Sequence, residues 1–230
     1  MGDANVVGHV HGRLIAFDLD GTLVDSRRDL TDSANQLIEE LGGTQLAEEH
    51  IGRMIGEGAA ILVRRALEAA GLHDRPGALA RFLDIYETRL LDTTTAYAGI
   101  VDAVQAARNV ASVAVVTNKP TRATERLLDG LRLRALFDDV IGGDGVYPRK
   151  PDPTGLMSLM ARAGASNDRT MLVGDSPIDR ETAKRAEVRC CMARYGFGYS
   201  LFATGHPADS DWTVTSAFEL PAIFERFTVG

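Results

Sequence analysis

The sequence predicts an α/β protein in which a doubly wound parallel sheet is joined to a small all-helical unit. Three observations carry this prediction. Short apolar runs recur along the chain, helix-like stretches separate the later runs, and one interval near the N-terminus contains only helical patterns. The chain has 230 residues, of which 45% are apolar and 25% charged, and this is enough for one sizeable core and a smaller second unit.

The apolar runs are the predicted strands of the sheet. Each has an apolar centre without polar alternation and ends at Gly, Asp or Asn, which is typical of strands that are covered on both faces. In chain order they are RLIAFD (13–18), SVAVVTN (112–118), DDVIGGD (138–144), RTMLVGD (169–175) and VRCCMARYG (188–196).

Helix-like stretches follow the later strands. They span Thr121 to Leu131, Pro153 to Ala163 and Asp179 to Ala186. Strands that alternate with helices form parallel sheets with helices on both faces, so the sequence indicates a Rossmann-like core.

The interval from residue 27 to residue 92 breaks this alternation. Its apolar residues recur at helical spacing, as in Leu37, Ile38 and Leu41, and glycines separate the patterns. We therefore predict a helical insert between the first and second strands. The predicted division is a tail at 1–12, an α/β core at 13–26 and 93–230, and the insert at 27–92.

Charge and cysteine content narrow the class of function. A net charge of −7 and a pI near 5.3 give no electrostatic footprint for nucleic acid or an anionic membrane, so the favoured partner is a small molecule. Cys190 and Cys191 are sequence neighbours and poor disulfide partners, which suggests apolar strand residues in a reducing compartment. No signal peptide or membrane-spanning stretch is evident, so we expect a cytoplasmic location.

Two acids, Asp18 and Asp20, follow the first predicted strand. The carboxyl ends of parallel strands face a ligand crevice, so these side chains stand where chemistry is expected. A single aspartate there is typical of a turn or a helix N-cap, whereas two neighbouring carboxylates repel each other unless a positive charge lies close by. The pair therefore indicates a positively charged partner.

Polar groups also follow later strands. Thr117 and Asn118 end the second, Lys150 lies in a proline-framed loop after the third, and Asp175 and Asp179 follow the fourth. Taken singly, Thr117 would serve as a cap, Lys150 as a solvated loop charge and Asp179 as a helix-start acid. Together they provide hard oxygen ligands, an ammonium and a hydroxyl, which are the groups needed to hold Mg²⁺ and a phosphoryl group.

These residues make the chain similar to the haloacid dehalogenase superfamily, in its phosphatase branch with a helical cap. The four motifs of the family occur in order, and the resemblance runs from about Arg13 to the last helix. The insert at 27–92 corresponds to the cap domain of the family. The motifs read Asp18-Leu19-Asp20-Gly21-Thr22, then Thr117, then Lys150 before Pro151, and finally Gly174-Asp175-Ser176-Pro177-Ile178-Asp179.

The resemblance implies a reaction through an aspartyl-phosphate. Asp18 would attack phosphorus, and Asp20 would protonate the leaving alcohol and then activate water, a role that we expect crowding by other acids to support. Mg²⁺ would bind carboxylate oxygens of Asp18 and Asp175 and the backbone carbonyl of Asp20. Asp179 would act on the metal through water or through indirect contacts.

The resemblance also assigns the groups that handle the phosphoryl oxygens. Lys150 would neutralise these oxygens and Asp18, while Thr117 and the backbone amide of Asn118 would orient them. Because phosphate-monoester hydrolysis is among the slowest uncatalysed reactions, positioned charge must supply much of the rate enhancement.

Members of the superfamily that catalyse other reactions can be recognised by single residues. Members that dehalogenate lack the second aspartate, so Asp20 argues against that activity, and phosphonate cleavage uses a cap lysine, which the interval 27–92 does not contain. A sugar phosphomutase stays open, although Thr22 fits the phosphatase pattern better. A phosphate-binding regulatory protein with little turnover is the alternative from a different class.

Two segments resemble phosphoglycolate phosphatases of this superfamily: the Gly-x-Gly helix entry in MIGEGAAILVRRALEAAG and the Tyr-Gly-x-Gly loop in ARYGFGYS. We therefore expect a small phosphorylated metabolite as the substrate, with phosphoglycolate as the first candidate. We expect the protein to be a monomer or a homodimer. Glu57 stands where bacterial relatives often carry a neutral or basic residue. Glu57 either faces the crevice and disfavours a substrate carboxylate, or is a solvated acid at the start of a helix. In the same way, Arg53, Arg64 and Arg65 either bind a substrate carboxylate or lie in solvent.

Overall fold

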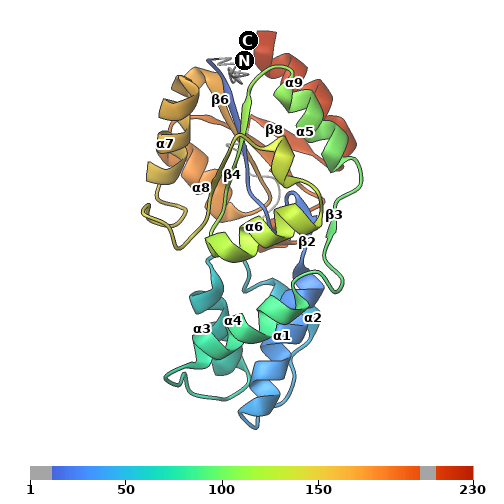
Figure 1. Cartoon of the computed structure of the whole chain (residues 1–230), viewed down its shortest axis with the longest axis vertical. Coiled ribbons are helices and arrows are strands. Elements are labelled where there is room, and N and C mark those ends of the chain that lie inside the picture. The colour runs from blue at the N-terminus through green and yellow to red at the C-terminus, as the bar shows by residue number, and fades with distance from the viewer. Residues whose placement is uncertain (1–11, 203–210, 230) are drawn as a thin grey trace, which may run out of the picture.

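The fold combines a parallel β-sheet with a group of helices at one end of the sheet. The structure is a computed structural model that describes residues 12–202 and 211–229, so most of the predicted tail at 1–12 lies outside the described residues. Figure 1 shows the sheet and its flanking helices in the upper half and the helices α1 to α4 below them. The predicted α/β class with a doubly wound parallel sheet is confirmed.

Six strands pair in parallel in the order β5-β4-β1-β6-β7-β8. Five of them match the predicted apolar runs. The sixth, β8, has no counterpart among the predictions because it is only three residues long and buries only its last residue. The strands are β1 Leu14–Phe17, β4 Ser112–Val116, β5 Asp139–Ile141, β6 Thr170–Gly174, β7 Arg189–Ala193 and β8 Trp212–Val214.

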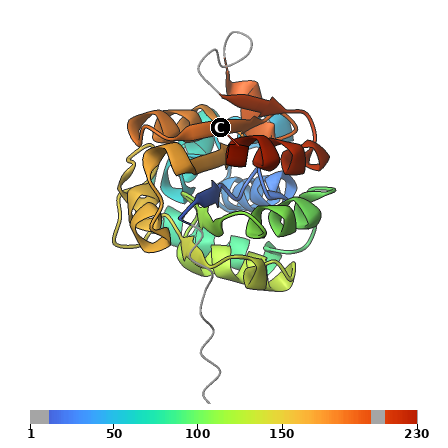
Figure 2. The same cartoon turned by 90° about the horizontal axis from the view of Figure 1, so that it is seen from above.

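The strand β1 lies inside the sheet and is covered on both faces. Ile15 and Phe17 belong to a buried cluster that includes residues of α5, α6 and α9, while Leu14 and Ala16 belong to another with residues of α7 and α8. This division follows from the two-residue period of a strand. Figure 2 shows helices on both sides of the sheet. They are α5 Ile100–Arg108, α6 Thr121–Gly130, α7 Thr154–Ala163, α8 Pro177–Arg185 and α9 Leu220–Val229.

The helix α8 begins two residues before its predicted start at Asp179. The Ser176 hydroxyl accepts a hydrogen bond from the Asp179 amide, and the Asp179 carboxylate accepts one from the Ser176 amide. This reciprocal capping box, with Pro177 at the first helical position, favours the earlier start. Asp179 is thereby fixed in the first turn of α8, close to the end of β6.

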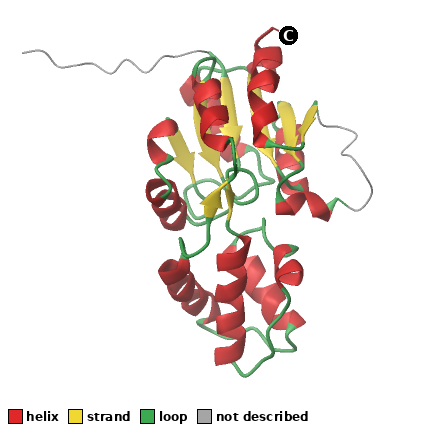
Figure 3. Ribbon diagram, turned by 90° about the vertical axis from the view of Figure 1, so that its right-hand side faces the viewer, coloured by secondary structure: helices red, strands yellow, loops and turns green. Residues whose placement is uncertain are grey.

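Four helices lie between β2 and β3, where the sequence predicts a helical insert. The helix α1 packs against α2, α3 and α4, and Leu37 and Ile38 are buried as the helical spacing predicts. Figure 3 shows these helices below the sheet. The exact division into core and insert at residues 27 and 92 stays a prediction. The elements are α1 Arg27–Glu40, α2 Glu48–Gly52, α3 Ala59–Ala69, α4 Ala78–Arg89, β2 Val24–Asp25 and β3 Thr95–Ala96.

Short 3₁₀ helices occur in the connections of the core. One of them contains the last two residues, Phe197 and Gly198, of the Tyr-Gly-x-Gly loop. Their bounds are Arg134–Leu136, Asn167–Arg169, Phe197–Leu201 and Ala217–Glu219.

A buried carboxylate joins the two places where the chain enters and leaves the insert. Asp29, in the first turn of α1, accepts hydrogen bonds from the backbone amides and the hydroxyls of Thr93 and Thr94. Burial alone would raise the pKa of Asp29, but these hydrogen bonds outweigh burial and hold the pKa below its ordinary value. The start of α1 is therefore bonded to the segment that leads into β3.

The two cysteines are buried, unpaired thiols in β7, as the sequence predicts. Burial raises the pKa of both Cys190 and Cys191, so each thiol stays protonated and unreactive near neutral pH. Among the helices of residues 12–202 and 211–229, none combines the length and apolar character needed to cross a membrane.

Candidate active site

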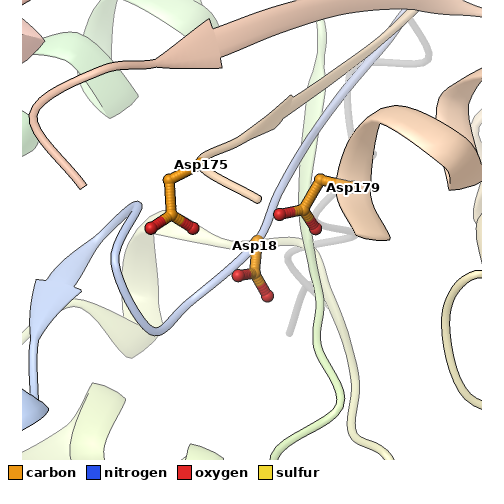
Figure 4. A group of neighbouring side chains, drawn as sticks. All are labelled: Asp18, Asp175 and Asp179. Carbon is orange, nitrogen blue, oxygen red and sulfur yellow. The ribbon is translucent and has the colours of Figure 1, made fainter. Parts of the chain in front are cut away.

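Three carboxylates meet at the carboxyl end of the sheet. Asp18 follows β1, Asp175 follows β6, and Asp179 lies in the first turn of α8. One carboxylate oxygen from each lies within 4.8 Å of the others, and all three residues are buried. Figure 4 shows the three side chains converging. The structure thus brings together three of the four residues that the family resemblance predicts as metal ligands.

Backbone contacts hold these carboxylates in place. The Asp18 amide donates to the Val173 carbonyl of β6 at 2.9 Å, and the Gly198 amide donates to Asp175 Oδ2 at 2.7 Å. Gly21 has a positive φ of 91°, and a Cβ at this position would overlap the Asp175 carboxylate. The first motif therefore needs glycine at position 21, both for its conformation and for this close approach.

Lys150 places an ammonium group among the carboxylates. Its Nζ lies 2.7 Å from Asp18 Oδ1 and 2.6 Å from Asp179 Oδ1. The other oxygen of Asp179 accepts hydrogen bonds from the Ser176 amide and hydroxyl, so Asp179 both caps α8 and pairs with Lys150. Burial alone would lower the pKa of Lys150, but the charges of Asp179 and Asp18 outweigh it and raise the pKa, so the ammonium stays charged.

The cluster carries more negative charge than Lys150 neutralises. Burial raises the pKa of Asp18 to about 7, with Lys150 opposing the shift and Asp179 adding to it. Burial, followed by the charges of Asp179 and Asp18, also raises the pKa of Asp175 well above its ordinary value. A bound cation would relieve this repulsion. Because the cluster offers several hard oxygen atoms, it could hold a divalent metal ion.

Asp20 stands apart from this cluster. Its two carboxylate oxygens lie 2.8 and 3.0 Å from the Nζ of Lys119, and the Ser26 hydroxyl donates a further hydrogen bond to it. The groups that bind this carboxylate are therefore a cation and a hydroxyl, rather than the crowding acids expected from the sequence. Lys119 was missed, although it directly follows Thr117 and Asn118 and the same strand-end argument applies to it.

Thr117 and Asn118 lie at the end of β4, and both are buried. The Asn118 side-chain amide donates to the backbone carbonyls of Gly56 and Lys150, each at 2.9 Å. Asn118 thereby joins the core to the turn before α3, a contact for which the sequence has no signal. The roles of the Thr117 hydroxyl and the Asn118 backbone amide in binding phosphate stay predictions.

A cavity of about 40 Å³ lies between the core and the insert. The core contributes Asp18, Asp20 and Lys119, and Lys119 is the only basic side chain among the described residues that line the cavity. Tyr86 of α4 also lines the cavity, and its hydroxyl is buried. The rest of the insert side is mainly apolar, which suits a small organic ligand; it consists chiefly of Leu30, Ile55, Ala59, Leu62, Phe82 and Leu83.

Glu57 lies in the turn before α3, between the two glycines of the Gly-x-Gly entry. Its carboxylate pairs with Arg65, and its side chain is 44% exposed. Arg64 lies beside Glu68, while Arg53 lines a separate surface groove. The structure does not bring these charged groups to the cavity, and the effect predicted for Glu57 on specificity stays a prediction.

Comparison with known proteins connects this site to a family. A family model described as haloacid dehalogenase-like hydrolase matches residues 15–193. Phosphoglycolate phosphatase 1 of Pseudomonas aeruginosa is 40% identical over 195 residues, which cover 81% of this chain and 71% of the relative. The phosphoglycolate phosphatase of Rhodospirillum rubrum is also 40% identical over 195 residues, which cover 80% of each chain.

Solved structures share the fold. One described as a predicted phosphoglycolate phosphatase from Haemophilus somnus has a TM-score of 0.85 and 27% identity, covering 94% of this chain and 99% of that chain. CbbY from Rhodobacter sphaeroides, solved in complex with phosphate, has a TM-score of 0.71 at 24% identity, with 90% and 96% of the two chains covered. The family match extends from β1 to β7 and contains every residue of the carboxylate cluster. The chain belongs to the haloacid dehalogenase-like hydrolase family.

Proposed function

We propose that this protein is a Mg²⁺-dependent phosphatase that hydrolyses a small phosphorylated metabolite, with phosphoglycolate as the first candidate. The observation that most directly supports this function is the buried group of Asp18, Asp175 and Asp179 beside Lys150. The names of the two curated relatives support the choice of substrate. A cytoplasmic location and a monomeric or homodimeric state stay predictions.

Asp18 would act as the nucleophile. Its attack on phosphorus releases the alcohol and leaves an aspartyl-phosphate, which divides one slow hydrolysis into two displacements. The nucleophile must be ionised, yet burial in the carboxylate cluster raises the pKa of Asp18 to about 7. Positive charge beside Asp18 favours the ionised form, and Lys150 at 2.7 Å supplies part of that charge.

Asp20 would carry the proton in both steps. It lines the same cavity as Asp18, and Lys119 and Ser26 fix its carboxylate. In the first step it would give a proton to the leaving alcohol, and in the second it would take one from the water that attacks the aspartyl-phosphate. Lys119 would act as a positioning residue, because it contacts Asp20.

Carboxylate oxygens of Asp18 and Asp175, together with the backbone carbonyl of Asp20, would hold Mg²⁺. Bound there, the metal would compensate negative charge on the phosphoryl oxygens. Asp179 would act mainly by fixing Lys150, since one of its oxygens pairs with that ammonium and the other caps α8. Thr117 and the Asn118 amide would orient the phosphoryl group.

The deciding experiment is phosphate release from p-nitrophenyl phosphate and from a panel of metabolites that includes phosphoglycolate. We expect hydrolysis with Mg²⁺, loss of activity after chelation, and recovery when Mg²⁺ returns. Full activity after exhaustive chelation would contradict the metal site. An isomeric sugar phosphate as the product would favour a phosphomutase, and phosphate binding without turnover would favour the regulatory alternative.

A further inference from the structure

The cavity contains a buried hydroxyl whose proton has no acceptor. Tyr86 in α4 is 3% exposed and lines the cavity together with Asp20 and Lys119. Its hydroxyl makes no hydrogen bond of regular geometry among the residues that the structure describes, although the Lys119 ammonium lies close enough to interact with its oxygen. The Lys119 Nζ lies over the ring, 4.7 Å from its centroid, but an ammonium can only donate hydrogen bonds. The hydroxyl of Tyr86 is therefore a donor that a ligand oxygen would satisfy.

This donor is fixed in place and stays protonated. The Tyr86 ring stacks on Phe82, with 5.9 Å between the centroids and 12° between the ring planes. Burial raises the pKa of Tyr86 to about 12, although the charge of Lys119 opposes the shift. Buried polar groups are nearly always hydrogen-bonded in folded proteins, because losing water without gaining a partner is unfavourable. An unpaired donor in the wall of a cavity therefore points to a ligand.

We propose that Tyr86 sets substrate specificity by donating a hydrogen bond to an oxygen of the leaving group, at the end remote from phosphorus. This inference rests on the proposed phosphatase function and deepens it. The insert side of the cavity is otherwise mainly apolar, so among the described residues Tyr86 supplies the polar side chain that a leaving group would meet there. The nearby Lys119 ammonium favours an anionic oxygen.

The chemistry of this wall defines a substrate class. It fits a short phosphate monoester whose leaving group has a small apolar body and ends in an oxygen acceptor, above all a carboxylate. Phosphoglycolate belongs to this class, whereas ethyl phosphate has nearly the same length but no terminal oxygen. The two esters therefore isolate the contribution of the Tyr86 hydroxyl.

The test compares Tyr86→Phe with the parent enzyme on these two substrates. Losing a hydrogen bond to a charged acceptor should lower kcat/KM for phosphoglycolate by about 10- to 100-fold. The value for ethyl phosphate should stay close to that of the parent. Phenylalanine keeps the ring that stacks on Phe82, so the variant should fold, and thermal unfolding followed by circular dichroism checks this.

A matched control and a binding measurement complete the experiment. Tyr147 also carries a hydroxyl, but it bonds to Ser158 and does not line the cavity, so Tyr147→Phe should match the parent on both esters. In an Asp18→Asn background, adding Tyr86→Phe should raise the Kd of phosphoglycolate, measured by calorimetry, without any need for turnover.

Two other outcomes would overturn the proposal, and a third would contradict only the proposed function. An unchanged kcat/KM for phosphoglycolate would mean that the hydroxyl holds only water. Equal losses on both esters would mean that Tyr86 acts on Asp20 through Lys119 rather than on the substrate. If the parent hydrolyses no ester, the proposed function fails, and the Kd measurement still decides whether Tyr86 binds phosphoglycolate.

Discussion

At the scale of single residues, each of the two neighbouring aspartates in the first motif pairs with a different lysine. Lys150 pairs with Asp18, and Lys119 pairs with Asp20. The sequence predicts that these acids need a positive partner, and the structure provides a separate protein cation for each. Asp18 shares the Lys150 ammonium with Asp179, so the negative charge around Asp18 is only partly neutralised. Asp20 is the one carboxylate that forms an ion pair with Lys119 among the described residues. The negative charge that no protein cation neutralises therefore lies beside Asp18 rather than beside the Asp20 side chain, and a metal ion would bind there.

The two aspartates should respond differently to amide substitution. Asp18→Asn should reduce turnover of every ester by about 10⁴-fold or more, because the amide cannot form the acyl phosphate. Asp20→Asn should slow an alkyl phosphate by about 10²–10⁴-fold, and an activated aryl phosphate less, because a good leaving group needs little acid assistance. Phosphate release from folded variants measures both. Near-normal activity of Asp18→Asn would refute the nucleophile assignment.

Breaking the second ion pair should reduce stability. The side chains of Lys119 and Asp20 are only 3% and 11% exposed, so Lys119→Met leaves a nearly buried carboxylate without its cation. We expect the free energy of unfolding to fall by about 3 kcal/mol. Urea unfolding gives this value, and the double variant Lys119→Met/Asp20→Asn, which also removes the charge, should regain most of it. A single variant as stable as the parent would show that the pair contributes little.

At the scale of elements, the strand ends could be predicted because buried parallel strands are continuous apolar runs. Asp18 and Asp175 stand where such runs stop, so their meeting followed from the pattern alone. The strands β2, β3 and β8 could not be predicted in this way, since each has only two or three residues and depends on pairing across the fold. The position of Tyr86 at the cavity could not be predicted from the sequence either, because Tyr86 lies on the buried face of α4 as Phe82 does and the pattern does not distinguish the two.

The bond between Asp29 and the segment before β3 should depend on pH. The pKa of Asp29 is lower in the folded protein than its ordinary value of 3.8, so its contribution to stability is present above that pH and is lost as the pH falls through the folded pKa. We expect Asp29→Asn to lower the free energy of unfolding at pH 7 by about 2 kcal/mol. The gap between variant and parent should narrow near pH 3.

Urea unfolding at the two pH values measures this effect. Asp74→Asn is the control, because Asp74 is an exposed aspartate in the connection between α3 and α4 and should change stability little at either pH. A loss in Asp29→Asn that is the same at pH 7 and pH 3 would show that the carboxylate charge is not what stabilises this junction.

At the scale of the whole molecule, the motif residues and the apolar side chains of the insert lie on opposite sides of one cavity. The core side carries the motif residues, so the class of reaction was readable from the sequence. The insert side is assembled from separate helices, and Leu30, Leu62 and Tyr86 meet only through the packing of α1, α3 and α4. The sequence does not mark these positions, because each is one apolar or aromatic residue in an amphipathic helix.

Metal binding should change the pH dependence of stability of the whole protein. The pKa values of Asp18 and Asp175 are raised in the folded state, so without metal their protonation favours folding at low pH, and this stability is lost as the pH rises, for Asp18 through about 7. Mg²⁺ would bind the deprotonated carboxylates, so it should raise the Tm more at pH 8 than at pH 5.5.

The matched variant is Asp175→Asn, which removes one of the buried like charges. In the presence of chelator at pH 8 it should unfold about 3 °C above the parent. It should also lose both the response of the Tm to Mg²⁺ and the phosphatase activity. Thermal unfolding with and without Mg²⁺ measures the change in Tm, and phosphate release measures the loss of activity. An Asp175→Asn variant whose Tm responds to Mg²⁺ as that of the parent does would rule out Asp175 as a ligand.

The antiparallel pairing of β2 with β3 also bears on how proteins of this shape can evolve. Val24 lies opposite Ala96, so the chain departs from the core and returns to it at one place. The free energy of closing a flexible loop grows only by about 0.6 kcal/mol for each doubling of its length, so that junction tolerates segments of very different size. Recombination at β2 and β3 could therefore exchange the intervening helices as one genetic unit. A descendant protein would inherit the ancestral reaction centre unchanged and acquire a new substrate specificity in a single event.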